Sequence, residues 1–165
     1  MIASFKIDHT KLRPGLYLSR EDMAHDGTHK SLPVTTYELR FTMSNSEADP
    51  PLTPAAMHTI EHLGAIYLRS DPEWGPEIIY FGPMGCRTGF YLVMNGKYFP
   101  EELAELIGGM CQFIIDWKDR IPGAEPEECG NYRDHNLKAA QNAAAKYLAM
   151  LEDEAPGYDR FNYPE

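Results

Sequence analysis

The sequence predicts an α+β fold, with a mainly antiparallel sheet packed against about three main helices. Segments rich in β-branched and aromatic residues are joined by short hairpin-like turns, and three longer stretches carry apolar residues at helical spacing. A chain of 165 residues with 43% hydrophobic residues can bury a core of its own. We therefore expect one domain over residues 1–165, with a loose tail from about residue 155.

Four segments are expected to form the strands. SFKIDHTKL (residues 4–12) alternates apolar and polar positions, and VTTYELRFTM (34–43) has the composition of a strand. EIIYF (77–81) and FYLVM (90–94) flank the glycine-rich turn GPMGCRTG. Residues 20–33 contain an Asp-Gly pair and are expected to form a loop.

Each of the three helices has a start signal or a regular apolar stripe. Thr53 and Pro54 form a cap followed by proline, and the first helix should run to about Arg69. Pro100 opens the second helix, whose stripe includes Leu103 and Ile107. The third helix has apolar residues at helical spacing over residues 137–151, after an irregular link at 120–133.

The charge balance excludes some classes of partner. The chain has 15 basic and 25 acidic residues, a formal charge of -10, which disfavours binding to nucleic acid or to an anionic membrane. No apolar run is long enough to span a bilayer, and no leader is apparent, so we expect a cytoplasmic protein. Three cysteines without a leader favour reduced thiols over a disulfide framework.

The segment MHTIEHL in the first expected helix carries a metal-binding pattern. His58, Glu61 and His62 share one helix face, and H-x-x-E-H is the inverted form of the zinc-peptidase signature. Their neighbours are apolar, so these polar groups must be paired or ligating to offset their desolvation. A third ligand must come from elsewhere in the chain. The candidates are Glu125, Glu127, Glu128 and Cys129.

The three cysteines have different settings. Cys111 lies on the apolar stripe of the second helix and is expected to act as a small buried hydrophobe. Cys129, in an irregular link, is either a metal thiolate or a half-buried loop cysteine. Cys86 stands in a glycine-rich turn beside Arg87, and a nearby cation lowers the pKa of a thiol. It is either a reactive thiol or a cysteine that packs inward in a tight hairpin.

Four segments occur together and in a fixed order: SFKIDHT, HTIEH, PMGCRTGFY and ECGNYRDH. This combination resembles the S-ribosylhomocysteine lyases, the LuxS family, over residues 4 to about 151. The resemblance implies a homodimeric carbon–sulfur lyase with its active sites at the dimer interface. It also implies one divalent metal ion in each subunit, with Fe(II) as the native ion and Zn or Co(II) as alternatives.

The resemblance also assigns roles to particular residues. By motif, the metal ligands are His58, His62 and Cys129, and Glu61 and Cys86 form the acid/base pair. Ser4, His9 and Arg40 match substrate-binding positions. The implied reaction moves the carbonyl of S-ribosylhomocysteine along the sugar with the help of the metal. A β-elimination then gives homocysteine and 4,5-dihydroxy-2,3-pentanedione, the precursor of autoinducer-2.

The chain departs from the family pattern at one position, and two other functions remain as alternatives. Tyr80 stands where many family members have aspartate, which leaves substrate affinity or preference open. An inverzincin-type peptidase would use Glu61 to activate water and Glu127 or Glu128 as third ligand. A non-catalytic, metal-stabilised binding module would instead close its site with four protein ligands, with Cys86 as the fourth.

Overall fold

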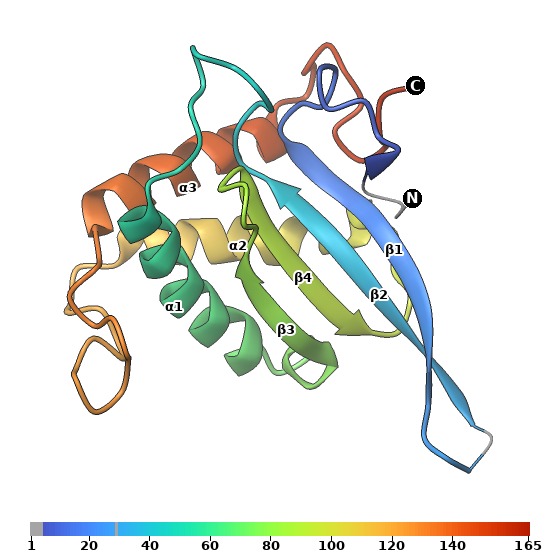
Figure 1. Ribbon diagram of the computed structural model, residues 1–165, viewed down its shortest axis with the longest axis horizontal. Helices are drawn as coiled ribbons and strands as arrows, with labels where there is room; N and C mark the ends of the chain where they lie inside the picture. The colour runs from blue at the N-terminus through green and yellow to red at the C-terminus, as the bar shows by residue number, and fades with distance from the viewer. Residues whose placement is uncertain (1–4, 29) are drawn as a thin grey trace.

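The computed structural model describes residues 5–28 and 30–165, and its sheet is entirely antiparallel (Figure 1). The strands follow the order β1-β2-β4-β3. Their bounds are β1 (Gly15–His25), β2 (Ser31–Arg40), β3 (Ile78–Pro83) and β4 (Gly89–Asn95). The antiparallel pairing and the three long helices confirm the predicted α+β class.

The three main helices begin close to where their sequence signals predict. They are α1 (Pro54–Ser70), α2 (Pro100–Asp116) and α3 (Leu137–Glu152), with a short 3-10 turn, η2 (Gly75–Glu77), after α1. Thr53 Oγ1 accepts a hydrogen bond from Ala56 N at 3.3 Å, which caps α1 as expected. Figure 1 shows the helices gathered together, with the β1–β2 hairpin extending away from them. In the described residues, no helix is both long and apolar enough to cross a membrane.

The prediction of a strand at residues 4–12 is wrong for the described residues 5–12. Ser4 lies outside the described residues, and the segment from Phe5 to Pro14 forms turns. The Asp8 carboxylate accepts hydrogen bonds from Thr10 N and Oγ1, a local bond that competes with a strand ladder. Residues 20–25 and 31–33, expected in a loop, instead extend the β1–β2 hairpin, whose backbone pairing does not depend on apolar side chains.

The register of β2 decides which side chains face the helices. Tyr37 and Leu39 belong to the hydrophobic core, so Glu38 and Arg40 point to the opposite face of the sheet. Arg40 is paired with Gly89, directly after the turn that carries Cys86. This pairing places the Arg40 side chain beside that turn.

The last residues of the chain lie beside the start of β1 (Figure 1). Arg160 O accepts a hydrogen bond from Leu16 N at 2.8 Å, and the Tyr158 hydroxyl donates to Pro14 O at 2.9 Å. The segment that we expected to be loose thus contributes backbone and side-chain contacts to the edge strand.

Candidate active site

The two histidines of α1 are oriented by backbone carbonyls from the link between α2 and α3. His58 Nδ1 lies 2.9 Å from Asp134 O, and His62 Nδ1 lies 2.7 Å from Pro122 O. A carbonyl oxygen can only accept, so each Nδ1 carries the proton and each Nε2 keeps its lone pair. This is the arrangement in which imidazoles ordinarily bind a metal ion.

Cys129 lies close enough to His58 to share a ligand sphere with it. The distance from Cys129 Sγ to His58 Nε2 is 3.3 Å. A thiolate and an imidazole on one tetrahedral zinc ion lie about 3.6 Å apart, given the usual bond lengths. The backbone N–H of Asn131 also donates to Cys129 Sγ at 3.4 Å.

The carboxylates considered as third ligands have other environments. Glu125 forms an ion pair with Arg120, and Glu127 and Glu128 are exposed to solvent. In the described part of the chain, the hydrogen bonds and ion pairs of the histidines do not include any of these carboxylates. The geometry therefore favours the Cys129 thiol as the third donor.

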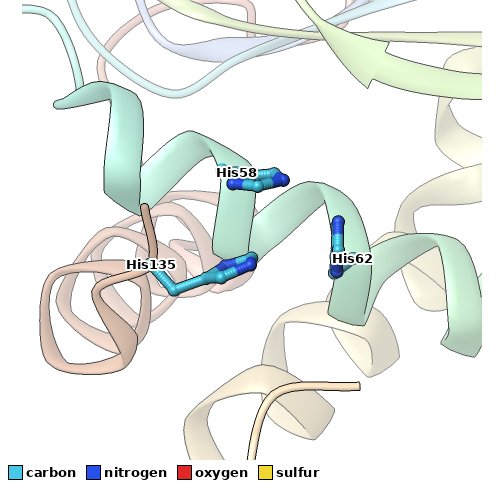
Figure 2. Close-up of side chains that lie close together, drawn as sticks. All are labelled: His58, His62 and His135. Carbon is cyan, nitrogen blue, oxygen red and sulfur yellow. The ribbon is translucent and has the colours of Figure 1, made fainter. Parts of the chain in front are cut away.

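A third histidine, which the sequence analysis missed, joins this cluster (Figure 2). The donor nitrogens of His58, His62 and His135 all lie within 4.8 Å of one another. Thr59 Oγ1 donates to Ala55 O, so His135 Nδ1, 3.2 Å from Thr59 Oγ1, must itself donate a hydrogen bond. His135 Nε2 is then a buried acceptor without a partner among the described residues.

The His135 ring is neutral and stacked on a neighbour. Burial, and then the nearby His58 and His62, lower the pKa of His135 to about 4. Its ring lies 4.0 Å from that of His58, with 17° between the planes. A metal ion lies in the plane of each imidazole that binds it, so two stacked rings in this arrangement cannot share one ion. His58 and His62, at 84° to each other, are better placed to do so.

Only one signal in the sequence could have pointed to His135. It lies in ECGNYRDH, six residues after Cys129. Its place beside α1 depends on a tertiary contact, in which Asn136 N donates to Thr59 Oγ1 at 3.0 Å.

Glu61 occupies the face of α1 that carries the histidines. Its Oε2 lies 3.6 Å from His62 Nε2, and its side chain is 33% exposed. A carboxylate with this access can exchange protons with a molecule bound at the histidine cluster.

Cys86 is presented by a tight turn between β3 and β4. Met84 N donates to Gly89 O, and Arg87 N donates to Met84 O, with Arg87 in the left-handed region at φ 62°. The Cys86 side chain is exposed, and its Sγ lies 3.0 Å from Thr88 Oγ1. A cysteine that packs inward is therefore excluded, and the thiol is accessible.

The surroundings of Cys86 favour its thiolate. Partial burial opposes ionisation, but hydrogen bonds from Thr88 and the Arg40 guanidinium lower the pKa of the thiol below its ordinary value. Arg40 Nη1 lies 3.8 Å from Cys86 Sγ and 2.6 Å from Thr88 Oγ1. Glu38, to which no sequence motif pointed, accepts hydrogen bonds from Arg40 Nε and Nη2 at 2.9 and 2.8 Å.

A cavity of about 450 Å³ opens at this thiol. It brings together His9, Arg40 and Cys86, which lie far apart in the sequence. Its remaining lining residues are Ser44, Asn45, Ser46, Glu47, Pro50, Pro51 and Thr88. The histidines of α1 and Cys129 are not among them. In one chain, the thiol cavity and the histidine cluster are therefore two separate groups.

Two other residues from the sequence analysis lie away from both groups. Cys111 is fully buried, and burial raises the pKa of its thiol to about 12, as expected for a core cysteine. Tyr80, in β3, is 49% exposed and does not line the thiol cavity.

Comparison with known proteins gives a consistent result. Residues 2–156 match the profile of the family S-Ribosylhomocysteinase (LuxS). The chain is 47% identical over 152 residues to an S-ribosylhomocysteine lyase of Borrelia garinii subsp. bavariensis, covering 92% of each chain. It is 44% identical to the enzyme of that name from Clostridium acetobutylicum, over 99% of this chain and 98% of the relative. Because the profile match spans most of its length, the chain belongs to the S-ribosylhomocysteinase (LuxS) family.

Proposed function

We propose that this chain is an S-ribosylhomocysteine lyase, a carbon–sulfur lyase that releases homocysteine and 4,5-dihydroxy-2,3-pentanedione. The observation that carries the proposal is the donor set around α1. His58 and His62 both bind backbone carbonyls through Nδ1, and Cys129 Sγ lies 3.3 Å from His58 Nε2. The family match and the curated relatives support the same activity.

In this proposal His58, His62 and Cys129 hold one divalent metal ion in each subunit. Two neutral imidazoles and a thiolate suit Fe(II), Zn and Co(II), and we propose Fe(II) as the native ion. Three protein ligands leave a coordination position for substrate. When bound, the metal would supply Lewis-acid polarisation of the sugar oxygens.

The proton transfers are assigned to Cys86 and Glu61. The lowered pKa of the Cys86 thiol increases the share of thiolate that can act as a base. Glu61, beside His62, is the second proton carrier. Arg40 and His9 line the cavity and would bind the substrate, and we extend this role to Ser4, which lies outside the described residues.

We further propose that the enzyme is a homodimer that completes its sites at the subunit interface. The thiol cavity of one chain does not include the histidine cluster of that chain. A second copy can supply the missing half, as an isologous dimer does twice. We also propose a cytoplasmic location, because all three cysteines are free and the chemistry needs reduced thiols.

The test is release of a free thiol from S-ribosylhomocysteine. Protein prepared anaerobically with Fe(II) or Co(II) should release homocysteine, detected with a thiol reagent, together with a dicarbonyl product that 1,2-phenylenediamine traps. Cys86→Ala should keep its metal and lose turnover by at least about 100-fold, as expected for an acid/base group. Cys111→Ala, a matched cysteine control in the core, should keep turnover. Absence of release from the metal-loaded protein would overturn the proposal.

A further inference from the structure

The Glu38–Arg40 ion pair is buried on the face of the sheet that the helices do not cover. The side chains of Glu38 and Arg40 are 0% and 4% exposed. The core residues Tyr37 and Leu39 alternate with them along β2, so the pair points away from the helices. A second layer must therefore exclude water from the pair.

The C-terminal segment, residues 158–165, supplies part of this layer. Tyr17 is opposite Glu38 in the β1–β2 register and points to the same face. The Tyr163 ring stacks on Tyr17, with centroids 4.8 Å apart and planes at 17°. Because Tyr17 is paired with Glu38, the Tyr163 ring stacked on Tyr17 lies over the same region of the sheet, and its hydroxyl is buried there. Burial, and then the nearby Glu38 carboxylate, raise the pKa of Tyr163.

Several contacts outside this stack hold the segment in place. Leu16 N donates to Arg160 O, and Lys11 Nζ donates to Glu165 O at 2.6 Å. Gly15 permits the close approach, because a Cβ there would lie 2.6 Å from Arg160 O. Residues 158–165 lie beyond residue 156, where the family match ends.

The ion pair connects this layer to the thiol. Glu38 accepts hydrogen bonds from Arg40 through Oε2 and from Ser19 through Oε1, so the carboxylate is fixed from two sides. The remaining edge of the Arg40 guanidinium meets Thr88 and Cys86. Water at Glu38 would raise the local dielectric constant and weaken the field of Arg40 at the thiol.

We propose that the C-terminal segment is a positioning element for the reactive thiol, in which Tyr163 keeps the Glu38–Arg40 pair dry and so keeps the Arg40 guanidinium directed at Cys86. This inference rests on the proposed function, because it gives the thiol a role. Its test measures the thiol itself and is independent of turnover.

The readout is the pH dependence of Cys86 alkylation by iodoacetamide, followed on the Cys86 peptide by mass spectrometry. Other polar and titratable groups around this thiol stay unchanged in the variants. They are Thr88 and Arg87 in its own turn, Tyr91 of β4, and His9 and Glu47 of the cavity wall. Any shift in midpoint can then be assigned to the ion pair.

Tyr163→Ala should move the alkylation midpoint to higher pH by roughly half a unit to one unit, because the thiolate loses stabilisation. Tyr163→Phe should keep the wild-type midpoint, since the hydroxyl makes no hydrogen bond of good geometry among the described residues and the ring alone provides the cover. Lys11→Ala, which removes the contact to Glu165 but keeps Tyr163, is the matched control and should also leave the midpoint unchanged.

A chain ending at Asn162 provides a second version of the test if Tyr163→Ala does not fold. It removes Tyr163 but keeps the hydrogen bond between Leu16 and Arg160. If this truncated chain or a folded Tyr163→Ala variant alkylates with the wild-type midpoint, the segment has a structural role only and the proposal is overturned. An equal shift in Tyr163→Phe would also overturn it.

Discussion

At the scale of single residues, the histidine cluster is preorganised by groups that are not ligands. The carbonyls of Pro122 and Asp134 fix the tautomers of His62 and His58. Contacts of this kind orient ligands and raise their basicity. The cluster also holds more donors than a three-ligand site needs, because His135 Nε2 is buried and unpaired among the described residues. Cys129 and His135 are therefore the two positions where ligand assignments can be separated.

Cys129→Ala should lower metal affinity by at least about 100-fold, since it removes one of the ligands that we propose. His135→Ala should lower it by no more than about tenfold, because His135 supports His58 by stacking and is not placed to share its ion. Metal content after dialysis, measured by mass spectrometry, distinguishes the two, and a sulfur-to-cobalt charge-transfer band in the Co(II) form reports the thiolate directly. Loss of metal in His135→Ala but not in Cys129→Ala would assign the third ligand to histidine.

At the scale of elements, α1 packs unusually closely on the sheet and on α2. A Cβ at Gly64 would lie 2.6 Å from Phe81 Cε1 and 3.0 Å from Met110 Sδ. Both neighbours are core side chains with little room to move. Because α1 packs this closely, its distance from the sheet is fixed. The positions of His58 and His62, on the neighbouring polar face of the helix, are fixed with it.

Gly64→Ala should lower the free energy of unfolding by up to about 2 kcal/mol. The helix gains about 1 kcal/mol in propensity, but overpacking a core costs about 1–3 kcal/mol. Gly108→Ala in α2 is the matched control, because a Cβ there meets only Leu148 Cδ1 at 3.5 Å. It should raise the free energy of unfolding by up to about 1 kcal/mol. Urea denaturation measures both, and a stabilised Gly64→Ala would show that the contact relaxes without cost.

At the scale of the whole molecule, the thiol cavity of one chain does not include the histidine cluster of that chain, and we propose that a second copy brings the two together. If they do so across a dimer interface, each active site combines the metal ligands of one subunit with Cys86 of the other. In such a dimer, two inactive variants can together form an active site, which is impossible when each site lies within a single chain.

Mixing His58→Ala with Cys86→Ala should restore activity. Each variant alone is inactive, but a mixed dimer contains one site with both intact groups, so random exchange should give about one quarter of wild-type turnover. Sedimentation analysis should show a dimer for each variant and for the mixture. No recovery from a mixture whose subunits have exchanged would place both groups of a site in the same chain.

The sequence by itself determined the features that depend on near neighbours. Thr53 and Pro54 set the start of α1, and i, i+3, i+4 spacing placed His58, Glu61 and His62 on one face, because helix geometry is local. The combination of four motifs identified the family. The sequence also predicted the turn around Cys86, because glycines between two strands are a local signal. It left open whether the thiol is reactive or packs inward.

Only the tertiary structure decided which distant groups meet. Cys129 lies 71 residues from His58, and residue types and spacing alone did not separate it from the nearby carboxylates, whereas the fold brings its Sγ to 3.3 Å from His58 Nε2. The strand at residues 15–25 was missed because its outer half is polar and is stabilised by backbone pairing with β2. Glu38 and Arg40 form their pair through strand alternation, but it is buried only because distant segments pack over it. The physical reason is common to all of these cases: spacing along the chain fixes local direction, whereas burial and proximity arise only when separate elements pack together.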